Sequence, residues 1–395
     1  MSKSKRKLWI GLGVGLIALF VLAVLGAFLL YRDLIAPLRS RGYTPPKPLG
    51  PPGVSKGAGF LSKSVFFSDS RLGEVTDIAL GELDPAPGPE LGIAGRRAAL
   101  FIDPDSKRVK AKAAWEVTPI RPGVDRLPTH VDMVDVTGDH ICEFMNRGSW
   151  GDDAALMDHS GKVLWSYGGM PGVDDMCAGD VDGDGVLEFA VSFNGGGGVH
   201  LLDRNGKKRW QRPDGNAWHI EMADANGDGK LEIVNSGGGG ITVRDTRGNT
   251  ISESGMKAPS LVAPFSLCRW PGKQGPARVL YCGNGVLWLI DFDGEVQAEF
   301  KTAQVNFVGH ARGLTVQLEP GRPEYLAVAI SYLAETKTIF CLFDSNRKLV
   351  YQEILPEDCQ AITALQLDKS GREALLVGGE GKVWQYAAPV AAASR

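Results

Sequence analysis

The chain has 395 residues, and its 43 basic and 46 acidic side chains give a formal net charge of −3. This balance argues against a nucleic-acid partner, because proteins that bind phosphate backbones carry a concentrated basic surface. The 51 glycines and 44% hydrophobic residues indicate many tight turns in a well-packed β-protein, and six cysteines are too few for a disulfide-rich scaffold.

Residues 8–31 form an uncharged stretch that is long enough to cross a bilayer as a helix. Residues 1–7 precede it as a short basic tail. The apolar run is longer than the core of a cleavable signal and ends without a small-residue cleavage site, which favours an uncleaved signal anchor over a cleaved signal peptide. Basic residues also follow the helix, but the tight cluster in front of it favours a single-pass cell-membrane protein whose C-terminal domain is extracytoplasmic, either periplasmic or extracellular.

Residues 32–60 are predicted to be a linker. Five prolines lie between Pro45 and Pro52, and such a composition forms a semi-rigid, extended spacer. Residues 61–395 then form the folded domain.

A short sequence pattern recurs about every 45 residues through this domain. It consists of an apolar residue, the pattern Asp-x-x-Gly and a further apolar strand, as in Asp158 to Gly161 and Asp203 to Gly206. Weaker copies begin at Asp103, Asp245, Asp291 and Asp344. Each pattern lies between two alternating runs and therefore predicts a hairpin turn. Four strands per repeat indicate an all-β, seven-bladed β-propeller, with six or eight blades as alternatives.

The last repeat lacks a fourth strand. Residues 63–70 precede the first repeat and are otherwise unassigned, so we expect them to supply the missing outer strand and close the ring. Glycine runs at 195–198 and 237–240 are interpreted as tight turns between second and third strands.

Two carboxylate-rich loops stand between the first and second strands of consecutive repeats. Their oxygen ligands occupy positions 1, 3, 5 and 9, with a backbone carbonyl at position 7, which suits Ca²⁺. An EF-hand is excluded because position 12 is not Glu and the flanks read as strands. The expected ligands are Asp180, Asp182, Asp184, Val186 and Glu188 in the first loop, and Asp224, Asn226, Asp228, Lys230 and Glu232 in the second.

These loops resemble the FG-GAP/VCBS repeats of integrin-alpha-like β-propellers. The resemblance implies structural Ca²⁺ at two sites. A third loop, from Asp135 to Glu143, departs from the pattern with Thr137 at position 3 and His140 in place of the turn glycine, so we expect no tight Ca²⁺ binding there. Trp165 and Trp210 also resemble the docking tryptophans of quinoprotein propellers, although a tryptophan on an outer strand more often packs between blades.

Polar residues precede these loops in three successive repeats: His130, Asp132, Asp175, Cys177, His219 and Glu221. Alternate residues share one face of a strand, so these side chains are expected near one rim of the central channel. A metal or anion site at this rim is one hypothesis, and ordinary polar lining of a water-filled channel is the other.

No recognised catalytic, nucleotide-binding or zinc motif occurs in the sequence, so we assign no catalytic residues and no small-molecule substrate. Cys268 and Cys282 flank a short turn and are one candidate disulfide. The sequence favours a protein- or glycan-binding scaffold over an enzyme. The alternatives are a propeller enzyme, either quinoprotein-like or acting on polysaccharides, and an accessory subunit of a membrane complex.

Overall fold

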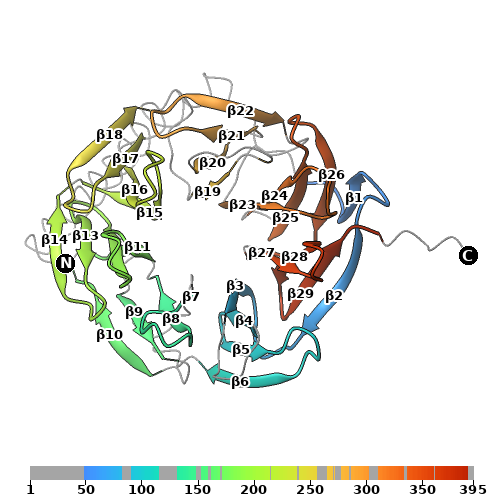
Figure 1. Cartoon of the computed structure of the whole chain (residues 1–395), viewed down its shortest axis with the longest axis horizontal. Helices are drawn as coiled ribbons and strands as arrows, with labels where there is room; N and C mark the ends of the chain where they lie inside the picture. The colour runs from blue at the N-terminus through green and yellow to red at the C-terminus, as the bar shows by residue number, and fades with distance from the viewer. Residues whose placement is uncertain are drawn as a thin grey trace, which may run out of the picture. The chain divides into compact units, whose positions relative to one another are not determined.

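The computed structural model describes residues 49–81, 90–114, 131–147, 153–158, 162–169, 171–213, 215–237, 240–255, 265–269, 271, 277–283, 286–301, 310–332, 336–359 and 361–389. These residues form seven antiparallel sheets arranged as a ring (Figure 1). No helix in these ranges is long and apolar enough to cross a bilayer. The expected anchor, residues 8–31, lies outside the described residues.

The first four blades follow one pattern, in which sequential strands are neighbours. Blade 1 comprises β3 (Val75–Gly81), β4 (Glu90–Gly95), β5 (Ala98–Ile102) and β6 (Val109–Ala114). Blade 2 comprises β7 (Val131–Val134), β8 (Glu143–Asn146), β9 (Ala154–Met157) and β10 (Val163–Tyr167). Blade 3 comprises β11 (Val173–Gly179), β12 (Glu188–Phe193), β13 (Gly198–Leu202) and β14 (Lys208–Arg212). Blade 4 comprises β15 (Ala217–Ala223), β16 (Glu232–Gly237), β17 (Gly240–Arg244) and β18 (Thr250–Gly255).

Of the last three blades, the sixth and the seventh each include a strand from the N-terminal side of the domain. Blade 5 comprises β19 (Ser266–Cys268), β20 (Arg278–Gly283), β21 (Val286–Ile290) and β22 (Val296–Lys301). Blade 6 comprises β23 (His310–Val316), β24 (Tyr325–Tyr332), β25 (Lys337–Phe343), β26 (Leu349–Leu355) and a fifth strand, β1 (Gly53–Lys56). Blade 7 comprises β27 (Ile362–Gln366), β28 (Glu373–Gly379), β29 (Lys382–Ala387) and β2 (Ser62–Ser68).

The expected ring closure is confirmed. Strand β2 pairs antiparallel with β29, in a register that places Ser62 opposite Ala387. One finding was not expected: β1 lies within the range assigned to the linker, yet it pairs with the outer edge of blade 6, with Gly53 opposite Ile354. An uncovered strand edge presents unpaired backbone groups, and β1 satisfies those of β26.

The core lies between the sheets. Within each blade the first strand is nearest the centre of the ring and the fourth is outermost, except in blade 6, where β1 lies outside the fourth strand (Figure 1). The apolar faces of adjacent sheets pack on one another, as where the ring of Phe101 in blade 1 stacks on that of Phe144 in blade 2 with a centroid separation of 5.2 Å. This packing fixes neighbouring inner strands side by side, and therefore fixes the side chains that they carry.

The recurring Asp-x-x-Gly pattern forms the turn between the third and fourth strands, as predicted. In blade 3, Gly206 N donates to Asp203 O at 2.9 Å, and Gly206 has a φ of +75°. The indole of Trp165 in blade 2 lies against this turn and donates from Nε1 to Arg204 O at 3.0 Å. Trp210 repeats the arrangement one blade later. These tryptophans pack between blades, as the more ordinary interpretation of the sequence holds.

Candidate functional site

The loop of blade 3 joins β11 to β12 and wraps its backbone around a carboxylate. Gly183 N donates to Asp180 Oδ1 at 2.7 Å, and Gly185 N donates to Asp180 Oδ2 at 2.8 Å. The φ values of Gly183 and Gly185 are +79° and +84°, a region that glycine adopts without the cost of a Cβ. Val186 N donates to Asp184 Oδ1 at 2.8 Å. The loop conformation is therefore supported by its own backbone donors.

The loop of blade 4 joins β15 to β16 and has the same conformation. Gly227 N donates to Asp224 Oδ1 at 2.6 Å, and Gly229 N donates to Asp224 Oδ2 at 2.9 Å. Lys230 N donates to Asp228 Oδ1 at 2.9 Å. The sequence repeat thus corresponds to a structural repeat, residue by residue.

The divergent loop of blade 2 adopts this conformation as well. Gly138 N donates to Asp135 Oδ1 at 2.7 Å, and His140 N donates to Asp135 Oδ2 at 3.0 Å. His140 has a φ of +68° at the position where the other two loops have glycine. A non-glycine residue in this region is strained by about 1–3 kcal/mol. Whether this loop binds Ca²⁺ stays a prediction.

The ninth position of each loop is a buried glutamate. Glu143, Glu188 and Glu232 are 6%, 0% and 5% exposed. One carboxylate oxygen of each accepts a backbone hydrogen bond from the residue after the first aspartate of its loop, at 2.8, 3.2 and 2.9 Å. Burial raises the pKa of all three carboxyl groups. A buried carboxylate of this kind gains most from a nearby cation.

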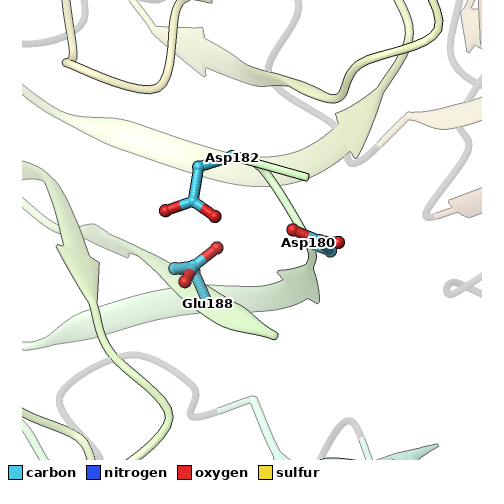
Figure 2. A group of neighbouring side chains, drawn as sticks. All are labelled: Asp180, Asp182 and Glu188. Atoms are coloured by element: carbon cyan, nitrogen blue, oxygen red, sulfur yellow. The ribbon is translucent and has the colours of Figure 1, made fainter. Parts of the chain in front are cut away.

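In blade 3 the acidic side chains converge. Figure 2 shows Asp180, Asp182 and Glu188, whose ligand atoms lie within 4.8 Å of one another. No other trio of acidic, histidine or cysteine side chains gathers so closely in the described ranges. The guanidinium of Arg209 lies against this trio, with Nη1 2.9 Å from Asp182 Oδ2 and Nη2 2.8 Å from Glu188 Oε1. The Glu188 Oε1 atom is buried and this contact lacks hydrogen-bond geometry.

In blade 4 the donor to the acidic side chains is the amide of Asn226, which belongs to the loop itself. Asn226 Nδ2 donates to Asp228 Oδ2 and to Glu232 Oε1, both at 3.2 Å. Asn226 Oδ1 accepts from Asp228 N at 2.8 Å. All ten sequence-predicted ligands therefore lie in two equivalent loops, and oxygen donors of this kind and number suit a hard cation such as Ca²⁺.

A second group of charged side chains lies on the inner strands of blades 2 to 4. Its hub is Arg147, which follows β8 and is 4% exposed. Arg147 Nη1 contacts Asp132 Oδ2 at 2.8 Å, and its Nε and Nη2 contact the two carboxylate oxygens of Asp175 at 2.7 and 3.0 Å. Arg147 Nη2 also lies 3.6 Å from Glu221 Oε1. The guanidinium thus joins three carboxylates from three blades.

His219 belongs to the same network. Its Nδ1 pairs with Asp175, and its Nε2 donates to Phe265 O at 2.8 Å and lies 3.3 Å from Glu221 Oε1. Burial lowers the pKa of His219, but the two carboxylates outweigh it and raise this pKa to about 9. The imidazole is therefore protonated at neutral pH and has no lone pair for a metal. Both ring nitrogens of His219 are engaged by protein oxygen atoms. His130 lies outside the described residues.

The network extends towards blade 1. Burial and the charge of Asp132 raise the pKa of Asp77 on β3 to about 7, although Arg312 and Arg147 act in the opposite direction. The inner strands therefore hold acidic groups that compete for the same few cations. Arg147 was not singled out in the sequence. The available signal was charge balance, because three acidic positions converge on one rim and need a buried basic partner.

The candidate disulfide is wrong. All six cysteines are free and buried. On β19 and β20, Cys268 is paired with Arg278, whereas Cys282 lies two residues beyond the pair formed by Ser266 and Leu280. The two thiols therefore occupy different positions along the hairpin. Burial raises the pKa of both to about 12, so neither is poised as a thiolate.

Comparison with known proteins agrees with this architecture. Residues 180–234, which contain both loops, match the model of the FG-GAP-like repeat. No curated protein matches the sequence. Among solved structures, BBS1N in complex with ARL6DN is 14% identical with a TM-score of 0.54, over 84% of this chain and 98% of that chain. An inactive variant of virginiamycin B lyase from Staphylococcus aureus with quinupristin is 12% identical with a TM-score of 0.54, over 83% and 100%. At these identities the likeness concerns the fold alone.

Proposed function

We propose that this seven-bladed β-propeller with an FG-GAP-like repeat is a membrane-anchored, extracytoplasmic module that binds a protein or glycan partner. Its carboxylate loops hold structural Ca²⁺, and the ring acts as a rigid scaffold. The observation that carries the proposal is the state of the polar groups on the inner strands of blades 2 to 4. Arg147 and His219 are both occupied by neighbouring carboxylates, so they rigidify the ring rather than stand ready for acid–base chemistry.

Calcium would act on stability in this proposal. The ligands are Asp180, Asp182, Asp184, Glu188 and the carbonyl of Val186, and Asp224, Asn226, Asp228, Glu232 and the carbonyl of Lys230. An ion held there would stiffen the turn between the first two strands of each blade. A ligand that binds only the folded state increases the free energy of unfolding by about 2.7 kcal/mol when its concentration is 100 times its Kd.

The thermal midpoint of the full-length protein in mild detergent tests this role. It should rise when excess EDTA is replaced by about 1 mM Ca²⁺, the range in which extracellular sites fill. The combined substitutions Asp182→Ala and Asp228→Ala should remove this rise. An unchanged midpoint in the wild type would contradict the calcium proposal and leave the acidic loops as ordinary turns.

The location can be tested with a single accessible thiol. Because all six native cysteines are buried, Lys369→Cys at an exposed turn would introduce a uniquely reactive site. A membrane-impermeant maleimide should label this variant in intact cells and should not label the wild type. Labelling of the variant only after the cells are lysed would place the propeller in the cytoplasm and refute the proposed topology.

The binding role is tested on the purified full-length protein. A glycan array and in-cell photo-crosslinking from exposed outer turns should identify a ligand, and titration of that ligand should saturate without its chemical change. Turnover of the ligand would instead favour the enzyme alternative. If the protein instead co-purifies repeatedly with the same membrane proteins in detergent and shows no saturable binding of a free ligand, an accessory subunit would be favoured.

A further inference from the structure

The fourth strand of six blades carries a bulge at one equivalent position. In blade 3, Lys208 and Trp210 pair with Leu202 and Leu201, which leaves Arg209 between them. The corresponding bulged residues in blades 1 to 6 are Lys110, Leu164, Arg209, Ile251, Gln297 and Val350. A bulge redirects a side chain out of the strand's alternation.

In blades 1 and 3 this bulged residue is basic and reaches the buried glutamate that begins the second strand. Lys110 Nζ forms an ion pair with Glu90, whose side chain is 2% exposed. Arg209 Nη2 lies 2.8 Å from Glu188, whose side chain is 0% exposed. Each glutamate therefore has a cation that is part of the same chain.

Arg209 also accounts for the convergence of carboxylates in blade 3. Three like charges within 4.8 Å repel one another strongly unless a cation lies among them. The guanidinium contacts both Asp182 and Glu188. Arg209 thus offsets one of the three negative charges of the trio in Figure 2 and contacts two of its carboxylates.

Blade 4 has no basic residue at the bulged position. The bulged residue is Ile251, and no ion pair joins the acidic side chains of its loop to a basic side chain within the described part of the chain. A cavity of about 380 Å³ lies beside the loop, and Asn226, Glu232 and Ile251 contribute to its lining. Asp291 and Asp293 of blade 5 line the same cavity, whose basic lining residue is Arg278. The place that Arg209 fills in blade 3 is therefore open and acidic in blade 4.

We propose that Arg209 is a built-in cation that replaces Ca²⁺ in blade 3, and that the loop of blade 4 is the one that takes up the metal. This inference rests on the proposed role of Ca²⁺ in the loops and narrows it from two loops to one. When Ca²⁺ enters, the amide of Asn226 turns so that its oxygen faces the ion, because its present orientation directs NH₂ towards Asp228 and Glu232.

The test compares two matched pairs of full-length variants. Each is stripped with EDTA, transferred to metal-free buffer and titrated with CaCl₂ by calorimetry, and the thermal midpoint is followed by tryptophan fluorescence. The first pair removes the equivalent ligand from each loop: Asp228→Ala should abolish the tight site, and Asp182→Ala should leave its affinity within about threefold. The second pair exchanges the bulged residues: Ile251→Arg should weaken binding at least about tenfold and raise the metal-free midpoint.

Arg209→Ile should gain a second Ca²⁺ site, and its metal-free midpoint should fall and recover with Ca²⁺. Arg209→Lys keeps the charge and should bind as the wild type does, which separates loss of the cation from failure to fold. Loss of the tight site in Asp182→Ala, or unchanged binding in Ile251→Arg, would overturn the inference. If the wild type binds no Ca²⁺, the calcium role is wrong. A Ca²⁺ site that then appears in Arg209→Ile would support replacement by Arg209, and its absence would overturn that as well.

Discussion

Replacement of Arg147 by methionine should remove the hub of the inner network. The guanidinium is 4% exposed and makes contacts of 2.7, 2.8 and 3.0 Å with two carboxylates. Loss of one partner from a buried charge group costs about 3–5 kcal/mol, because the remaining charges stay buried without compensation. We expect the free energy of unfolding to fall by about 3 kcal/mol, at the lower end of this range. The Asp132 side chain is 19% exposed and can be hydrated again, and His219 still contacts Asp175.

The loss should depend on pH with a definite sign. Burial raises the folded-state pKa of Asp175, but the charges of Arg147 and His219 outweigh it and hold this pKa below its unfolded value. A depressed carboxyl pKa contributes stability above the unfolded pKa of about 4, and this contribution is lost as the pH falls. Arg147→Met removes part of it, so the deficit should be larger at about pH 7 than at about pH 3. Urea denaturation of the full-length protein at both pH values measures this. Arg147→Lys, which keeps a charge but not the bidentate contact, serves as the matched control. A deficit below about 1 kcal/mol, typical of an exposed pair, would refute the reasoning.

Four further outcomes follow from the structure. Gly206→Ala should destabilise the protein by about 1–3 kcal/mol, because its φ is +75° and a Cβ would lie 2.7 Å from the Trp165 ring; Gly321→Ala, with φ +74° and no atom within 4 Å of a Cβ, should cost less in the same urea assay. His140→Gly should raise the free energy of unfolding by about 1 kcal/mol through relief of its left-handed φ, and a fall would contradict this. The folded-state pKa of Asp77 is raised to about 7, so its contribution favours folding at low pH and is lost as the pH rises towards and beyond 7. Asp77→Asn should flatten that part of the thermal midpoint profile, and an unaltered profile would count against the shift. Ellman's reagent should detect no reactive cysteine in the folded protein and six after denaturation without a reducing agent. Fewer than six would indicate a disulfide.

The architecture was largely readable from the sequence because its signals are local and repeated. The Asp-x-x-Gly turn recurs in successive blades, and its glycine adopts a positive φ where the pattern requires one, as at Gly206. The closing strand could be predicted because the last repeat lacked a partner and residues 63–70 had no other assignment. Strand β1 was missed, since a short strand on an outer edge has no alternation to distinguish it from a proline-rich spacer.

The loops were predictable as loops but not in their electrostatics. The spacing of acidic residues from Asp180 to Glu188 determines a local conformation, and this conformation is present. The partner of those acids, Arg209, comes from the fourth strand and reaches them through a bulge, which depends on pairing register rather than on sequence spacing. Arg147 was missed for the same reason, because its partners lie on other blades. Charge pairs made across strands or blades are tertiary information.

The closing strand also determines the order in which the chain can fold during synthesis. Strand β2 leaves the ribosome early, but its partner β29 is made last, and the hydroxyl of Ser62 bonds Ala387 O across 325 residues of chain. Until then β2 presents unpaired backbone groups, which can pair with a neighbouring nascent chain. Contacts this distant in sequence also form slowly. A nascent propeller therefore needs protection from aggregation for nearly its whole translation time, and a chain truncated before β29 would leave β2 permanently without its partner.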